Sequence, residues 1–386
     1  MKVVQLYELV NGITKEVLGE TAVVNEDLSN VVDIGREIID TDNLDAYVKK
    51  LVNHIGKVIF VDRLYSGGVP SVLMDSWEYG SILEKITADM PDATESDSWK
   101  LENGKDYSPD IFYQPSVSVK FFNSKVTFEI PLSFTELQVK QSFSNENQLN
   151  GFISMLTTSV ENAMTVKLDA LIMRTINNMI GETLLADLDN EGTIDYTQTG
   201  VKAVNLLNLY NNEYGTSITA EKAITDVDFI RYATYTIGLY SDRISKISTL
   251  FNVGGKERFT PNEMLHTVLL SDFEKASVTF LQSVTDNATM VALPNHETVP
   301  YWQGSGSTYS FNDVSKIDVK TSSGTVVSTT GILGIMFDRD AIGVTNLDKR
   351  TTTNYNPKAE FYTNFYKFEA GYYNDLNENF IVFFVA

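Results

Sequence analysis

The 386-residue sequence contains no cysteine. Disulfide bonds, thiol catalysis, iron–sulfur clusters and zinc sites that need a thiolate are therefore excluded. The chain is also short of positive charge, because 30 Lys and Arg residues stand against 51 Asp and Glu residues and leave a formal net charge of -21. A protein that binds nucleic-acid phosphates or an anionic membrane surface needs a basic face, so this balance argues against both partners.

Long apolar runs are missing as well. No stretch approaches the roughly 18 consecutive apolar residues of a membrane helix, and Met1–Glu8 lack the basic and apolar segments of a signal peptide. We therefore expect a protein that is made in a cytoplasm and has no membrane partner. Its 43% hydrophobic and 11% aromatic residues suffice for a sizeable core, which excludes global disorder. The length predicts two or three domains at roughly 150 residues each.

Residues that could carry catalysis or hold a cofactor form no recognisable motif. The three histidines, His54, His266 and His296, lie far apart and outside any His-Glu-x-x-His sequence, and no Gly-x-Ser-x-Gly nucleophile motif is present. Residues 254–257 suggest a phosphate loop but lack its first glycine and its Ser or Thr. Residues 304–307 predict a plain glycine-rich loop. We expect no enzyme, no catalytic residue and no cofactor.

Residues 187–198 resemble the first part of a calcium-binding EF-hand loop. The candidate ligands stand at the first, third, fifth and ninth positions, and they are Asp187, Asp189, Glu191 and Asp195. Position twelve is Gln198 instead of the bidentate Glu that completes the calcium shell. The alternative is a solvated acidic connector, which arises easily by chance in so acidic a chain. We favour the connector, assign no metal site and predict no specific calcium requirement.

The first part of the chain predicts short amphipathic helices over 28–39 and 44–61. Polar turns separate them, so we expect residues 1–65 to form an extended arm that carries small helices rather than a compact domain. Within residues 66–140, apolar and polar side chains alternate over 117–121 and again over 126–130. This pattern predicts a β-hairpin over 116–131 with an Asn123-Ser124 turn and one apolar face. An isolated hairpin is marginal in water, so its apolar face should pack on something else.

The strongest helical signal runs from Glu146 to Ile180, with apolar residues spaced by three and four. Ser144 is the expected N-cap and Gly181 the expected residue after the C-terminus. Leu156, Leu168 and Ile172 share the apolar face. About 35 residues at 1.5 Å each span roughly 50 Å, far more than one small core can cover. The helix is therefore either a member of a bundle or a spine that bridges a large flat domain.

The rest of the sequence predicts both helices and strands. Helices are predicted over 201–210, 226–247 and 271–280, and strands over 267–270 and 316–320. Residues 331–337 and 380–385 read as buried strands, with an aromatic stretch at 360–373 between them. The chain is therefore predicted to be an α+β protein.

This order of segments resembles the major capsid proteins of tailed bacteriophages of the Hong Kong 97 type. The most telling residues are Ile335–Val344, a strand followed by an acidic-basic turn, ahead of an aromatic sheet that ends the protein. Leu51–Ile59 is similar to the arm of head proteins from small phages of Gram-positive hosts. The resemblance covers essentially the whole chain.

The resemblance implies a Hong Kong 97-like fold with an N-terminal arm (1–65), an extended loop region (66–140), a spine helix of the peripheral domain (141–199), an axial domain (200–330) and a closing peripheral sheet (331–386). Its implied function is self-assembly, as pentamers and hexamers, into the icosahedral head shell of a virion built in the host cytoplasm. The hairpin would lie over a neighbouring subunit. The inter-subunit contact candidates are Val117, Val119, Phe121, Phe122, Lys125, Val126, Phe128 and Ile130.

Further partners follow from the same resemblance. Because the arm begins almost at Met1, we expect a separate scaffolding protein rather than a cleaved scaffolding segment, together with a portal and, in some heads, a decoration protein. The shell would enclose DNA without binding it specifically, and the acidity of the chain suits this role because like charges repel at short range. The alternative functions are another virion component, such as a tail tube or sheath protein, and less favoured, an enzyme or secreted calcium-binding domain.

Overall fold

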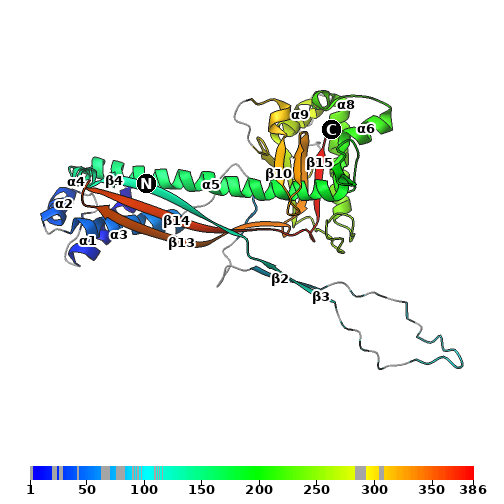
Figure 1. Ribbon diagram of the computed structural model, residues 1–386, viewed down its shortest axis with the longest axis horizontal. Coiled ribbons are helices and arrows are strands. Elements are labelled where there is room, and N and C mark those ends of the chain that lie inside the picture. The colour runs from blue at the N-terminus through cyan, green and yellow to red at the C-terminus, as the bar shows by residue number, and fades with distance from the viewer. Residues whose placement is uncertain are drawn as a thin grey trace. The chain divides into compact units, whose positions relative to one another are not determined.

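The computed structural model (Figure 1) describes residues 3–386 except 20–23, 26–28, 41–42, 62–69, 75–82, 89–90, 92, 94, 97, 108–109, 111, 113, 115, 283–292 and 304–307. The chain divides into two compact units, each made of separate stretches. The first unit comprises Met1–Gly68, Lys125–Leu171 and Thr345–Gly371, and the second comprises Val69–Ser124, Ile172–Val344 and Tyr372–Ala386. Helices and strands alternate irregularly along the chain, which confirms the α+β class.

Three N-terminal helices open the first unit: α1 (Val3–Leu18), α2 (Val31–Asp40) and α3 (Leu44–Val61). The predictions of α2 and α3 are confirmed, whereas α1 was not anticipated. The helices contact one another and bury Val10, Ile38 and Val48 completely. The expectation of an extended arm rather than a packed unit is therefore wrong, because three short apolar stripes that look unpartnered in sequence cover one another in space.

A four-stranded sheet has the order β1-β13-β14-β4. Its strands are β1 (Leu73–Met74), β13 (Ile342–Asn356), β14 (Phe361–Asn374) and β4 (Lys125–Thr135). β4 and β14 are antiparallel from Thr135 opposite Phe361 to Lys125 opposite Gly371. Phe134 on β4 meets Phe152 edge to face, with ring centroids 5.3 Å apart. After β4, the short helix α4 (Glu136–Ser142) begins with a capping box between Thr135 and Gln138.

The long helix α5 extends over Glu146–Leu188, so the predicted helix is confirmed and both of its predicted ends are wrong. Asn145, not Ser144, caps the helix, because its side-chain Oδ1 accepts a hydrogen bond from Gln148 N at 2.9 Å. Gly181 lies inside the helix, where an added Cβ would meet the Val319 side chain at 2.6 Å. The glycine permits close packing and does not end the helix. The predicted apolar face is confirmed, since Leu156, Leu168 and Ile172 are buried.

The second unit is built on a five-stranded sheet of order β7-β15-β12-β8-β9. The strands are β7 (Ala203–Asn205), β15 (Phe380–Phe384), β12 (Ile332–Asp338), β8 (Leu265–Leu270) and β9 (Glu297–Val299). β12 is antiparallel to both neighbours, while β15 pairs with β7, and β8 with β9, in parallel. The terminal strands therefore do not form one closing sheet as expected: β12 and β15 join this sheet, and β13 and β14 join the other.

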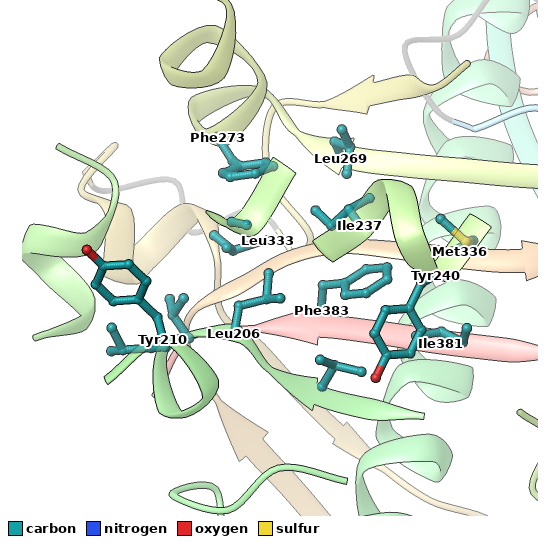
Figure 2. Close-up of a cluster of buried hydrophobic side chains, with 14 of the residues drawn as sticks. Leu206, Tyr210, Ile237, Tyr240, Leu269, Phe273, Leu333, Met336, Ile381 and Phe383 are labelled. Carbon is teal, nitrogen blue, oxygen red and sulfur yellow. The ribbon is translucent and has the colours of Figure 1, made fainter. Parts of the chain in front are cut away.

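Helices of the second unit cover this sheet with apolar side chains (Figure 2). They are α6 (Leu206–Tyr214), α7 (Ala220–Ala223), α8 (Val227–Ile244), α9 (Ser271–Gln282) and α10 (Phe311–Val314). Figure 2 shows Ile237 and Tyr240 of α8 beside Phe383 of β15, and the Tyr240 and Phe383 ring centroids are 5.5 Å apart. The predicted helix over 201–210 is partly wrong, because residues 203–205 form strand β7, which pairs in parallel with β15, and Asn205 then caps α6.

Three two-stranded elements complete the described chain: β2 (Leu83–Ala88) with β3 (Val117–Phe122), β5 (Asp189–Asn190) with β6 (Thr193–Ile194), and β10 (Ile317–Lys320) with β11 (Val326–Thr329).

The predicted strands at 117–121 and 126–130 exist, but the predicted hairpin between them is wrong. β3 pairs with β2, and β4 pairs with β14. Positive φ outside glycine occurs, among described residues, at Trp99, Glu191 and Glu360. The Asn123-Ser124 link thus lacks the φ that a two-residue hairpin turn requires.

Within the described ranges, no helix has the length and apolarity needed to cross a membrane.

Candidate functional site

The antiparallel pair of β2 and β3, here called the ribbon, carries an exposed apolar face. Val119 stands opposite Ile86, and Val117 stands opposite Ala88. The four large apolar side chains on this face are 46–65% exposed, and they are Ile86, Val117, Val119 and Phe121. Side chains alternate between the two faces of a strand, so these residues share one side of the ribbon. Glu84, which stands opposite Phe121, is the charged residue on this otherwise apolar face. Clustered exposed apolar side chains of this kind are typical of an interaction surface.

The opposite face of the ribbon carries two lysines and is fixed to the rest of the second unit. Lys85 and Lys120 are direct cross-strand partners. Both contact Asp375: Lys85 Nζ lies 3.0 Å from Oδ2, and Lys120 Nζ lies 2.8 Å from Oδ1. Lys85 Nζ also lies 2.8 Å from Glu378 Oε1, which Arg258 Nε approaches at 3.4 Å. These five side chains form what we call the ribbon anchor.

The charges of the ribbon anchor support one another. Burial alone would lower the pKa of Lys85, but the hydrogen bonds and negative charges of Glu378 and Asp375 outweigh it and raise that pKa. Burial would likewise raise the pKa of Asp375, but hydrogen bonds from Lys120, Lys85 and the Asn377 backbone, together with the positive charge of Lys85, hold it below its usual range. Both groups are therefore charged at neutral pH.

One aromatic contact extends the anchor. Phe122 at the end of β3 packs on Tyr373, with ring centroids 4.7 Å apart. Phe122 is therefore placed on the anchored side of the ribbon, away from Val119 and Phe121. This contact lies within the second unit.

The remaining contact candidates lie on β4, in the first unit. Val126, Phe128 and Ile130 are partly buried on one face of the strand. Phe128 packs on Phe368 of β14 with ring centroids 5.0 Å apart, and Lys125 forms a 3.0 Å ion pair with Glu369. The structure thus does not bring the eight candidates together on one hairpin. Val117, Val119 and Phe121 are free to meet a partner, whereas Phe128 and Lys125 already have partners in the same chain.

Several exposed apolar residues near the ribbon were not identified from the sequence. Ile86 on β2 belongs to the exposed face, and the segment that joins β2 to β3 includes the exposed residues Trp99, Leu101 and Phe112. The alternation of Glu84, Ile86 and Ala88 with Lys85 and Thr87 is the signal that could have indicated β2. This alternation covers too few residues to predict a strand when the partner strand is unknown.

The acidic segment 187–198 folds as a small hairpin rather than as an EF-hand loop. Glu191 and Gly192 both have positive φ, 53° and 89°, as a two-residue hairpin turn requires. Asp187 Oδ2 accepts hydrogen bonds from the backbone N–H groups of Lys202 and Ala203, both at 2.9 Å. Asp195 accepts from Thr197, and Asp189 Oδ1 accepts from Gly192 N at 3.1 Å. Over the described residues, no group of three or more metal-ligating side chains converges.

The described histidines and the loop at 254–257 make contacts typical of structural residues. His266 on β8 stacks on Phe337, and burial lowers its pKa. His296 Nδ1 lies 2.8 Å from Pro294 O. The loop at 254–257 is held by Asn252, which hydrogen-bonds to both N and O of Lys256. The His54 side chain and residues 304–307 lie outside the described part of the chain.

A comparison with protein families decides among the interpretations. The family model for Phi29-like phage major capsid proteins matches residues 10–384. This chain belongs to that family. It is a major capsid protein, a structural component of the phage virion that forms the head shell. The alternatives of a tail protein and of a secreted calcium-binding domain are thereby set aside.

Solved structures similar to this chain are also phage capsids. The capsid structure of Staphylococcus phage Andhra is 10% identical, covers 84% of this chain and 86% of that chain, and has a TM-score of 0.47. The capsid structure of Cyanophage P-SCSP1u is 9% identical, with 85% and 92% covered and a TM-score of 0.43. The mature capsid of bacteriophage PhiM1 is 7% identical, with 84% and 91% covered and a TM-score of 0.40. No curated protein matches the chain significantly.

Of the segments that the resemblance implies, the long helix α5 and the late strands β12–β15 are present as elements, whereas the ribbon takes the place of the predicted hairpin. The resemblance read from the sequence therefore agrees with the family.

Proposed function

We propose that copies of this capsid protein associate through the exposed face of the ribbon, which packs on a neighbouring subunit in pentamers and hexamers of the shell. The observation that carries the proposal is the division of the ribbon into two faces. The lysine face is bound to its own subunit through Asp375 and Glu378. The apolar face, with Ile86, Val119 and Phe121, is exposed on the same chain.

Burial of this face on a neighbouring copy would favour assembly. Burying one Val, Ile or Phe side chain contributes on the order of 1.5–3 kcal/mol relative to leaving it exposed. Four such side chains lie on the ribbon. The contact would be heterologous, since the ribbon of one copy meets a different surface on the next, and such contacts close into rings when the rotation permits. Small gains at each subunit therefore add up around the shell.

The role is structural rather than catalytic, and the place of action is the virion. The charge of -21 suits a shell that encloses DNA and does not bind it. The carboxylates of Asp187 and Asp375 are committed to hydrogen bonds and ion pairs within the chain. A scaffolding protein and a portal complete the proposed set of partners.

The test separates folding from assembly. Val119 and Phe121 are replaced together by Ser, and the protein is expressed with a scaffolding protein. Because both side chains are exposed in the single chain, the thermal unfolding of the unassembled protein should stay nearly unchanged, while closed shells seen by electron microscopy should be lost. Shells formed at the normal yield by this variant would refute the proposal.

A matched control uses the other strand. Phe128 is also a phenylalanine of this region, but it packs on Phe368 within the first unit. Phe128→Ser should therefore destabilise the folded chain, by about 1–3 kcal/mol or more given the lost aromatic pair and burial. If Phe128→Ser and the ribbon variant behaved alike in unfolding, the distinction between the two strands would be wrong.

A further inference from the structure

The ribbon anchor places two like charges directly opposite each other. Lys85 and Lys120 are register partners on adjacent strands, and like charges in that position destabilise a sheet. An isolated two-stranded ribbon is marginal in water even without this repulsion. The lysine pair is thus unfavourable for the ribbon alone and becomes favourable only with an anion placed between the two ammonium groups.

Asp375 is that anion, and its position is set by the body of the second unit. Its backbone N donates to Ala341 O at 2.8 Å, and its Oδ1 accepts from Asn377 N at 3.1 Å. The Asp375 side chain is only 1% exposed. The carboxylate is therefore held by its own surroundings, with one oxygen directed to each lysine.

Glu378 ties a third element into the same cluster. Its Oε1 contacts Lys85 on the ribbon and Arg258 on the loop that precedes β8. Lys85 Nζ also lies 3.4 Å from the backbone oxygen of Asp340. The ribbon is consequently attached at several points through one face only, and a strand that is held on one face must present its other face outward.

We propose that Lys85 and Lys120 are positioning residues for shell assembly. By binding Asp375 and Glu378 they set the rotation of the ribbon about its own axis, and thereby aim Ile86, Val119 and Phe121 away from their own subunit. This inference rests on the proposed function of the ribbon as a contact with a second copy of the chain. It assigns the direction of that contact to an ionic cluster on the opposite face of the ribbon.

The first measurement is made on the unassembled protein, so that it does not depend on assembly. Because the chain has no cysteine, a cysteine pair can be introduced without background at two exposed positions, Ala88 on the ribbon and Tyr235 on α8. Both positions lie in the second unit. Spin labels on this pair should give one narrow distance distribution by pulsed electron paramagnetic resonance.

The test variant is Lys85→Gln combined with Lys120→Gln, which keeps length and polarity but removes both charges. We expect the distance distribution to broaden and closed shells to be lost. Replacing both lysines by Arg preserves the charges and should restore the narrow distribution. The matched control is Lys125→Gln, which removes a nearby lysine that pairs with Glu369 outside the ribbon and should leave the distribution narrow.

The outcomes distinguish the two proposals. A narrow distribution in the double Gln variant overturns the positioning role, whatever happens to assembly. A broad distribution with shells at normal yield shows that the lysines position the ribbon but that the ribbon is not the contact, which refutes the proposed function. If the double variant fails to fold, as seen by circular dichroism, the single Lys120→Gln variant retains the Lys85 contacts. The single variant should show a partly broadened distance distribution. A distribution as narrow as that of the natural protein would overturn the positioning role of Lys120.

Discussion

Gly181 on α5 lies directly against Val319 on β10: a Cβ atom added to the glycine would stand 2.6 Å from Val319 Cγ2. Real Cβ atoms essentially never approach a neighbour so closely. The second unit therefore depends on the absence of a side chain at this point of the helix. Glycine costs a helix roughly 0.5–1 kcal/mol relative to Ala, so the close packing must outweigh that cost.

Gly181→Val is accordingly expected to lower the free energy of unfolding by about 1–3 kcal/mol, since inserted methyl groups force a well-packed interior apart. Val319 is β-branched and cannot easily rotate out of the way. The control is Gly151→Ala on the same helix, where an added Cβ meets nothing within 4 Å and stability should be unchanged or rise slightly. Urea denaturation of both variants provides the comparison, and equal effects would contradict the packing role.

Leu168→Ala should destabilise the chain by about 2–5 kcal/mol, because Leu168 is buried and its removal leaves a cavity. Val166 stands two residues earlier on α5 and is exposed. Val166→Ala should therefore change the free energy of unfolding by less than about 0.5 kcal/mol. Leu168→Asp should prevent recovery of folded protein altogether. Normal particles from Leu168→Asp would mean that this face of the helix is not a buried one.

The contribution of Asp375 to stability should depend on pH in a defined direction. Its folded pKa lies below the ordinary value of 3.8, so the stabilisation is present above that value and is lost as the pH falls through the folded pKa. The pKa of Lys85 lies above 10.5, so its contribution is present below that value and is lost as the pH rises through the folded pKa. The ribbon anchor is thus fully formed between these two limits.

Asp375→Asn provides the measurement. The difference in free energy of unfolding between the natural protein and this variant should be constant from about pH 5 to pH 9 and should shrink in stronger acid. Burial raises the pKa of Asp338, so the contribution of Asp338 to stability changes with pH in the opposite direction to that of Asp375. This residue is present in both proteins, so its effect cancels in the difference. If the difference in free energy of unfolding grew on acidification, the stabilising role of the ionised Asp375 would be contradicted.

Asp187 is expected to act as a hydrogen-bond acceptor and not as a calcium ligand. Asp187→Ala should cost about 1–3 kcal/mol, because two backbone N–H groups at the start of β7 lose their acceptor. Asp189→Asn, in an exposed turn, should have little effect. Calcium at millimolar concentration should leave the melting temperature of the natural protein unchanged. Micromolar calcium binding by calorimetry that disappears in Asp187→Ala would overturn this prediction.

Much of the local structure could be read from the sequence. The predicted limits of α3 coincide with the helix Leu44–Val61, and the buried strands β12 and β15 lie where continuous apolar runs predicted them. On the ribbon, the alternation of Val117, Val119 and Phe121 placed three apolar side chains on one face, and the structure leaves that face exposed. These features follow from periodicity within a few residues.

Strand partners could not be read in this way. β4 lies only two residues after β3, yet it pairs with β14, where Thr135 stands opposite Phe361. The ribbon anchor is equally non-local, since Lys120 meets Asp375 across 255 positions of sequence. For the same reason the sequence offered no means to tell Phe128, which has an aromatic partner, from Phe121, which is exposed.

The sequence by itself determined many of the helices and strands, because backbone periodicity and the alternation of apolar side chains act over neighbouring residues. It did not indicate α1, β2 or β7. The sequence also determined the family, since residues 10–384 match the family model of Phi29-like phage major capsid proteins. Only the tertiary structure decided which strands pair, where α5 ends and which face of the ribbon is exposed. Those choices depend on packing and ion pairs between residues hundreds of positions apart, and no local pattern records them.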